Sequence, residues 1–188
     1  MARRATDFAP GEYYHVYNRG CNKELIFRED ENYLYLTRLL CKSLRNRHVS
    51  MIAYCLMPNH YHLLMRQESD ILIREVMQDA FNAYVKAFNK RYGRTGTLFE
   101  ERFKAKHVKE DRYLIHLCRY IHRNPLEAKF VNDAGLWKYS DYLEWIGGKK
   151  NVQLVSDLFA GPEGYARFVT EYELSSKEVA GLNNYLFD

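Results

Sequence analysis

The longest periodic pattern in the sequence is a stripe of apolar side chains between Ile73 and Phe88, spaced three and four residues apart. This spacing predicts an amphipathic helix of about five turns that ends at Gly93 and buries one continuous face. A second helix with the same spacing is expected over residues 30–47. Two such helices need an apolar surface to cover, and strand-forming segments lie on either side of each.

Four segments have the composition of strands, and their order along the chain defines the fold. Residues 12–18 are aromatic and β-branched, and residues 49–56 form an apolar run. A tight Pro58-Asn59 turn leads into residues 60–66, and a short candidate follows at residues 104–108. The order strand, helix, strand, strand, helix, strand predicts an α+β fold. It would have an antiparallel sheet of about four strands, ferredoxin-like or RRM-like with a split βαβ arrangement, and helices on one face.

The C-terminal third is expected to be helical. A helix should begin at Asp111, a good N-cap residue, and end at Asn124, because Pro125 disfavours helical geometry in the residue before it. Residues 136–146 carry both tryptophans, and residues 152–188 are expected to form two or three short helices.

Composition excludes several classes of protein. No run approaches the roughly 20 apolar residues that span a membrane, and the first residues, MARRATDFAPGEYY, lack the apolar core of a signal peptide. The 4 cysteines form no CxxC pair, so neither a disulfide framework nor a cysteine zinc site is predicted. We therefore expect a cytoplasmic protein.

The charges are unevenly distributed along the chain. The formal net charge is +4, but residues 86–109 hold 8 Lys and Arg against 2 acids, whereas residues 151–188 hold 6 acids against 2 bases. A basic segment interleaved with Phe, Tyr and His suits a polyanion with stackable bases. Charge alone is equally compatible with a solvated basic face that binds nothing.

Two histidines share one face of a predicted strand. In residues 60–66 successive side chains alternate, so His60 and His62 face one side while Tyr61, Leu63 and Met65 face the core. Two neighbouring imidazoles can bind one divalent metal ion through neutral nitrogens. Taken by itself the pattern also fits two histidines on a sheet surface.

A second polar group lies in the predicted helix after Asp111. His116, Tyr120 and Asn124 are four residues apart and share a face, which would present a tyrosine hydroxyl and an amide oxygen together. Such a stripe is more often a solvent-facing edge of a helix.

Both groups occur in motifs that resemble one family. YCLMPNHYHLLM is similar to the histidine strand, and RYIHRNP to the tyrosine helix, of HUH transposases with one catalytic tyrosine, the IS200-like family. HVYNRG, the FEERFK segment and the Trp-Tyr-Ser stretch at residues 137–140 resemble its REP-associated branch. The resemblance spans residues 12–146, and it implies a catalytic domain over residues 1–150 with a C-terminal helical extension over residues 151–188.

The resemblance also implies the roles of the site residues. His60 and His62 would be metal ligands and Tyr120 the nucleophile, with Asn124 as a third ligand at a position where some relatives have glutamine. The cofactor would be Mg²⁺ or Mn²⁺. Tyr120 would cleave and rejoin single-stranded DNA through a 5′-phosphotyrosine, which stores the energy of the broken bond.

The expected partner is single-stranded DNA with a hairpin, such as a REP element or an insertion-sequence end; monomer and homodimer both remain open. Basic residues near the motifs are the expected DNA contacts: Arg3, Arg4, Arg19, Arg94, Arg102, Lys104, Lys106, Arg119 and Arg123.

The sequence leaves two rival functions open. A binding module without chemistry would use sheet aromatics such as Tyr13, Tyr17 and Tyr54 as a stacking platform, and a domesticated hairpin-binding relative would keep every motif. A hydrolase with water as nucleophile would need acidic ligands near the histidines, and the nearest acids, Glu68 and Asp70, follow the strand end.

Overall fold

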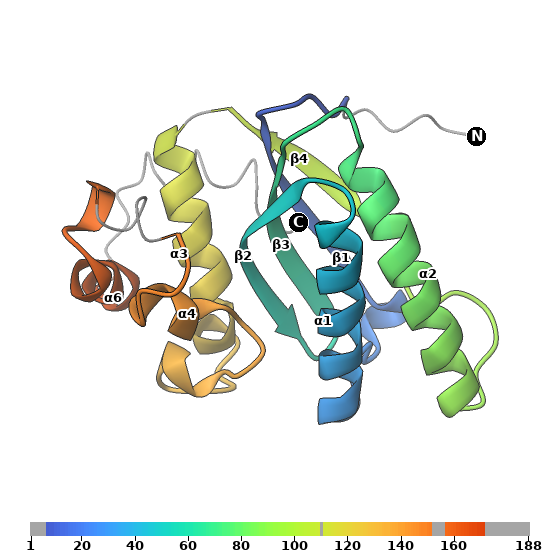
Figure 1. The fold of residues 1–188 in the computed structure, drawn as a ribbon. Helices are drawn as coiled ribbons and strands as arrows, with labels where there is room; N and C mark the ends of the chain where they lie inside the picture. Colours follow the sequence, from blue (N-terminus) through green and yellow to red (C-terminus); the bar gives the residue numbers. More distant parts are fainter. Residues whose placement is uncertain (1–6, 110, 152–156, 172–188) are drawn as a thin grey trace. The chain divides into compact units, whose positions relative to one another are not determined.

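The structure is a computed structural model that describes residues 7–109, 111–151 and 157–171. Its helices and strands are labelled in Figure 1 and follow in chain order: β1 (Tyr13–Arg19), the 3-10 turn η1 (Cys21–Lys23), α1 (Asp30–Arg45), β2 (Val49–Met57), β3 (His60–Gln67), α2 (Ile73–Arg91), β4 (Lys104–Val108), α3 (Asp111–Glu127), η2 (Ala134–Leu136), α4 (Tyr142–Ile146) and α6 (Pro162–Thr170). None of the helices in these ranges is long and apolar enough to cross a membrane.

The four strands form one open sheet with the order β2-β3-β1-β4. The two central strands, β1 and β3, pair antiparallel in a register that sets Tyr17 opposite His62 and Arg19 opposite His60. The predicted α+β class, with its sheet of four strands and its order of elements, is confirmed.

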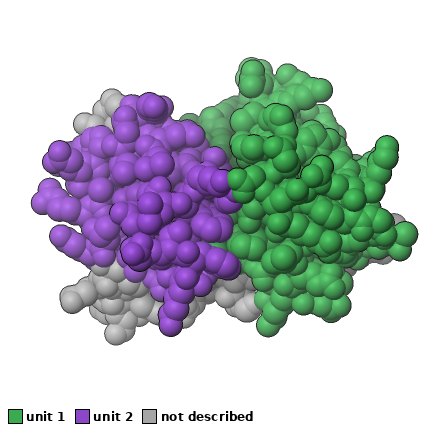
Figure 2. Space-filling model, turned by 90° about the horizontal axis from the view of Figure 1, so that it is seen from below, with its two compact units in different colours: residues 1–51, 56–107 green, residues 52–55, 108–188 purple. Residues whose placement is uncertain are grey.

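By its internal contacts the chain divides into two compact units, which Figure 2 colours separately. The first comprises residues 1–51 and 56–107, and the second comprises residues 52–55 and 108–188. The second unit is therefore built from two pieces of chain, one of which is four residues from the middle of β2. The domain boundary expected at residue 150 stays a prediction.

The core of the first unit lies between one face of the sheet and the pair of helices α1 and α2, which run side by side in Figure 1. The stripe expected from Ile73 to Phe88 is buried as predicted. On the sheet side, Tyr61 is 1% exposed and its ring centroid lies 4.6 Å from that of Phe81 on α2. Leu63 on the same strand is fully buried. Burial of this apolar face stabilises the unit by about 25 cal/mol for each Å² removed from water.

The end of α3 differs from the expectation. The helix was expected to stop at Asn124, but it continues through Pro125 to Glu127. The Ala128 amide still donates to the Asn124 carbonyl at 3.0 Å, and the Phe130 amide donates to the Pro125 carbonyl at 3.0 Å. Pro125 removes only its own amide donor, within one turn of the helix end, where carbonyl groups already lose their helical partners. A residue before proline disfavours helical geometry, but at Asn124 the two backbone hydrogen bonds outweigh this preference.

Candidate nucleic-acid cleavage site

His60 and His62 lie on the same face of β3, as the strand alternation predicted. Their ring centroids are 5.1 Å apart and the rings are nearly perpendicular, at 82°. His62 is fully buried, whereas His60, at the start of the strand, is half-buried. Tyr61, between the two histidines, packs on Phe81 of α2, and Leu63 and Met65 further along the strand are fully buried, so the core holds the strand that carries both histidines.

Each of these histidines has a partner at its Nδ1 atom. His60 Nδ1 lies 2.7 Å from Oδ1 of Asn59, and His62 Nδ1 lies 3.0 Å from Nε2 of His15 on β1. The rings of His15 and His62 are stacked at 5.1 Å. Sequence reasoning missed His15, because the segment EYYHVYN was interpreted only as an aromatic and β-branched strand.

The electrostatic environment keeps His62 neutral. Burial lowers the pKa of His62 well below its ordinary value, and the neighbouring His15 and His60 lower it further. A neutral imidazole is the form that ligates a metal ion. The donor chemistry of this strand face therefore fits a divalent cation. Among the described residues, no group of three or more His, Cys, Asp and Glu side chains is placed to hold a metal ion.

The candidate nucleophile lies on α3 in the second unit. Tyr120 is half-buried, with Asn124 one turn further along the helix and His116 one turn before it. Asn124 is only 8% exposed, and Leu117 and Ile121 on the neighbouring faces are fully buried. The structure thus brings His60 and His62 together on β3 and Tyr120 and Asn124 together on α3. That the two pairs form one site stays a prediction.

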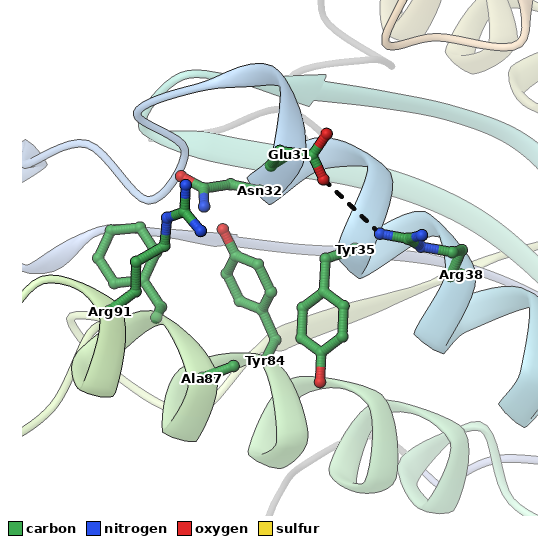
Figure 3. A pocket seen from close by; sticks show the side chains of 8 residues that line it. Glu31, Asn32, Tyr35, Arg38, Tyr84, Ala87 and Arg91 are labelled. Carbon is green, nitrogen blue, oxygen red and sulfur yellow. Dashed lines mark ion pairs between the residues drawn. The ribbon is translucent and has the colours of Figure 1, made fainter.

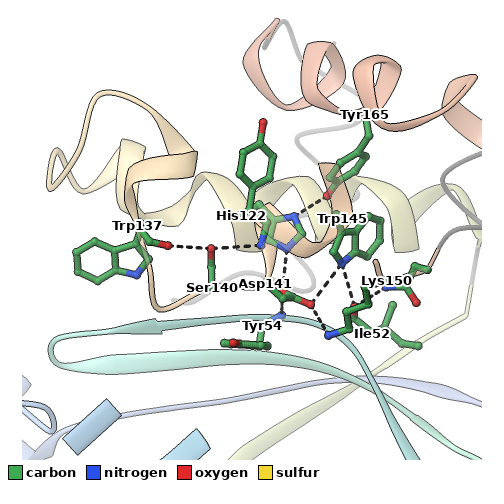
Figure 4. Close-up of polar contacts among 11 residues, drawn as sticks. Ile52, Tyr54, His122, Trp137, Ser140, Asp141, Trp145, Lys150 and Tyr165 are labelled. Carbon is green, nitrogen blue, oxygen red and sulfur yellow. Dashed lines mark hydrogen bonds and ion pairs between the residues drawn. The ribbon is translucent and has the colours of Figure 1, made fainter. Parts of the chain in front are cut away.

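Buried polar side chains around His122 form a hydrogen-bonded network that holds α3 in place (Figure 4). His122 Nδ1 lies 2.7 Å from the Tyr165 hydroxyl of α6, and His122 Nε2 lies 3.0 Å from Oδ1 of Asp141. Asp141 also accepts a hydrogen bond from the Tyr54 amide of β2 at 2.7 Å and pairs with Lys150. Both Asp141 and His122 are fully buried. The network fixes the rotation of the helix that carries Tyr120, and sequence reasoning did not find it.

The expected DNA contacts in the first unit differ in their surroundings. The Arg19 guanidinium donates to both carboxylate oxygens of Glu100, from Nε to Oε1 at 3.1 Å and from Nη2 to Oε2 at 3.0 Å, and Arg94 pairs with Glu24 at 3.1 Å. The Lys106 ammonium lies 5.6 Å from the centre of the Tyr17 ring. Arg102 and Lys104 are exposed, and Arg3 and Arg4 lie outside the described residues.

The two expected contacts on α3 hold the second unit together. The Arg119 guanidinium is 4.1 Å from the centre of the Phe168 ring, and the residue is only 4% exposed. Arg123 donates to Glu127 and to the Val169 carbonyl. Both arginines thus pack α3 against α6. Contact with DNA stays a prediction for all nine basic residues.

A pocket of about 250 Å³ lies between α1 and α2 in the first unit, and none of the candidate residues lines it (Figure 3). Its charged side chains are paired locally: Arg38 with Glu31 at 3.9 Å, and Arg91 with Glu29 at 2.5 Å. Both arginines that line the pocket thus have a glutamate partner.

Comparison with known proteins supports the reading of the two motifs. Residues 10–124 match the sequence model of the family described as "Transposase IS200 like". Among solved structures, a REP-associated tyrosine transposase bound to a REP hairpin superposes with a TM-score of 0.63 at 17% identity, covering 78% of this chain and 86% of that one. A putative transposase from Deinococcus radiodurans R1 gives a TM-score of 0.43 at 15% identity, with coverages of 65% and 96%. No curated protein matches the chain. Because the family match spans well over half of the sequence, the protein belongs to the IS200-like transposase family.

Proposed function

We propose that this protein is a metal-dependent, single-tyrosine transposase that cleaves and rejoins single-stranded DNA beside hairpins. One observation carries the proposal: the family match over residues 10–124 includes the histidine pair of β3 and also Tyr120 and Asn124 of α3. The residues of the two pairs suit that chemistry: β3 supplies two imidazoles, of which buried His62 has a pKa held well below its ordinary value, and α3 supplies a partly exposed phenol.

Tyr120 is the proposed nucleophile. Its phenolic oxygen attacks the scissile phosphorus, the bond from phosphorus to the 3′ oxygen breaks, and the phenolic proton is lost as the 3′ oxygen becomes a hydroxyl. The product is a 5′-phosphotyrosine, which keeps the phosphoester linkage and lets the reverse attack by a 3′-OH rejoin DNA without ATP. The half-buried position of Tyr120 leaves part of its ring accessible to a substrate.

His60, His62 and Asn124 are the proposed ligands of Mg²⁺ or Mn²⁺. When bound, such a cation supplies Lewis-acid neutralisation of the charge that develops on the scissile phosphate. The chain's own contribution is to hold two imidazoles at a fixed separation on a buried strand. Asn124 adds a neutral amide oxygen, a ligand type that both cations accept.

The proposed substrate is single-stranded DNA next to an imperfect hairpin. The solved relative with the same fold is a REP-associated tyrosine transposase bound to a REP hairpin, and HVYNRG and the Trp-Tyr-Ser stretch of this chain resemble that branch. Exposed Arg102, just before β4, and Lys104, its first residue, would contact backbone phosphates. We therefore assign the protein to the REP-associated branch.

The test is formation of a covalent adduct. The protein is incubated with Mn²⁺ and labelled single-stranded oligonucleotides that carry a hairpin, and it is then resolved on a denaturing gel. We expect a labelled protein band for the wild type and none for Tyr120→Phe, which keeps the ring and removes the nucleophile. The matched control is Tyr35→Phe, which removes a phenol from α1 and should leave the adduct unchanged.

Two outcomes would contradict the proposal. An adduct that persists in Tyr120→Phe would place the nucleophile elsewhere. Hairpin binding without an adduct, across hairpins of several sequences, would support the rival reading of a non-catalytic hairpin-binding protein.

A further inference from the structure

We propose that Asn59 and His15 are positioning residues that hold His60 and His62 with the ring proton on Nδ1, so that each presents Nε2 as its ligating nitrogen. The inference rests on the proposed function, since it concerns the same cation site. It adds two residues that the motifs do not assign to the chemistry. The observation that carries it is the pair of hydrogen bonds at the two Nδ1 atoms.

The amide of Asn59 determines the tautomer of His60. Its Nδ2 donates to the Lys23 carbonyl at 3.3 Å, which orients the amide so that Oδ1 faces His60 Nδ1 at 2.7 Å. An amide oxygen only accepts hydrogen bonds, so His60 must donate from Nδ1. In a neutral imidazole the other nitrogen, Nε2, then carries the lone pair that can bind a cation.

The turn that carries Asn59 is held firmly by backbone contacts. The Asn59 carbonyl accepts from the Gly20 amide at 2.8 Å, and the Pro58 carbonyl accepts from the amides of Ile26 at 2.8 Å and Phe27 at 3.0 Å. These bonds tie the turn to the segment after β1. The acceptor for His60 is thus part of a turn that backbone hydrogen bonds hold in place.

The pairing of β1 with β3 determines the surroundings of His62. Because Tyr17 lies opposite His62, His15 lies two residues along on the same face, and its Nε2 reaches His62 Nδ1 at 3.0 Å. Either ring could donate in this contact. If His15 donated, neutral His62 would carry its proton on Nε2 and could not ligate through that atom. If His62 donates, it has the same tautomer as His60, and both ligating nitrogens are Nε2.

A hydrogen bond to the second nitrogen of a ligating histidine fixes the ring orientation and raises its basicity, and its loss typically lowers metal affinity by about 10- to 100-fold. His15 is fully buried, so its acceptor nitrogen has few alternative positions. We expect the site to be preorganised for the cation by these two residues.

The first test reads the tautomers directly in the metal-free protein. Imidazole nitrogen shifts are recorded by NMR on the full chain labelled with ¹⁵N-histidine, and His60→Ala and His62→Ala assign the signals. We expect the proton on Nδ1 in both rings. A proton on Nε2 of either ring would overturn the assignment for that residue, whatever the protein does to DNA.

The second test measures Mn²⁺ affinity by calorimetry without DNA. Asn59→Leu and His15→Phe remove the acceptors while keeping side-chain volume, and we expect each to weaken Mn²⁺ binding by about 10- to 100-fold. Asn59→Asp and His15→Gln keep an acceptor oxygen and should restore most of the affinity. The matched control is His107→Ala on β4, which removes another hydrogen-bonded histidine that pairs with Glu12, and should leave Mn²⁺ affinity unchanged.

The outcomes separate the inference from the proposed function. If His62→Ala loses Mn²⁺ binding while Asn59→Leu and His15→Phe bind like the wild type, the positioning role is wrong and the metal site stands. If His62→Ala and His60→Ala both bind Mn²⁺ normally, the metal site itself is wrong, and the positioning role falls with it. Thermal unfolding of each variant confirms that it is folded at the temperature of the titration.

Discussion

Replacing Asp141 by alanine should destabilise the second unit by about 3 to 5 kcal/mol, the usual result of removing one partner from a buried, hydrogen-bonded charge network. The change removes the acceptor of the Tyr54 amide at 2.7 Å and of His122 Nε2 at 3.0 Å. Each buried donor left without an acceptor costs about 1 to 3 kcal/mol. Trp145 keeps its bond to the Ile52 carbonyl at 3.2 Å, so its indole adds little to the loss.

The measurement is urea-induced unfolding followed by tryptophan fluorescence. Both tryptophans, Trp137 and Trp145, belong to the second unit, so the signal reports the unit that the mutation affects. The control is Glu144→Ala on the exposed side of α4, which should change the free energy of unfolding by about 0.5 kcal/mol or less. A loss of unfolding free energy below about 1 kcal/mol for Asp141→Ala would refute the reasoning. It would mean that the hydrogen bonds and ion pairs of the network only balance the cost of removing its charged groups from water.

Burial raises the pKa of Asp141, but the hydrogen bond from His122 and the charge of Lys150 outweigh it and hold the pKa below its ordinary value. The stability that ionised Asp141 contributes is therefore present above the unfolded-state pKa of about 3.9 and is lost as the pH falls through the folded-state pKa. We expect the difference in unfolding free energy between the wild type and Asp141→Asn to shrink in acid. A difference that stays constant with pH would contradict this reasoning. Leu63→Ala, in the core below the histidines, should cost about 2 to 5 kcal/mol in urea unfolding followed by circular dichroism, whereas a loss under 1 kcal/mol would argue against a packed core there. Chelation with EDTA should abolish the covalent adduct and added Mn²⁺ should restore it, while an adduct that forms equally well in EDTA would exclude the proposed role of the cation.

The parts of the molecule that could be predicted from the sequence are those set by local periodicity. The two-residue repeat of β3 placed His60 and His62 on one face, and the three-to-four spacing of α2 identified its buried side, because both patterns follow from backbone geometry alone. The order of these elements then defined the sheet.

The contacts that escaped prediction join residues far apart in the chain. His15 is 47 positions from His62, and it reaches that ring only through the register of β1 on β3. His122 meets Asp141 and Tyr165 through packing of three helices, which no spacing in one segment encodes. The end of α3 was predicted wrongly because a local preference before Pro125 was given more weight than the hydrogen bonds that the following residues still make.

The four residues of β2 that belong to the second unit constrain how such a protein can be rearranged during evolution. A fragment that begins at Val108 would lack the Ile52 carbonyl, which accepts from Trp145 and Asn151, and the Tyr54 amide, which donates to Asp141. Fusing or exchanging the tyrosine-bearing half at a single crossover would therefore separate buried polar groups from their partners. A recombination that exchanged the whole tyrosine-bearing half would need breakpoints on both sides of residues 52–55 and another before α3. We therefore expect the histidine strand and the tyrosine helix to be inherited together.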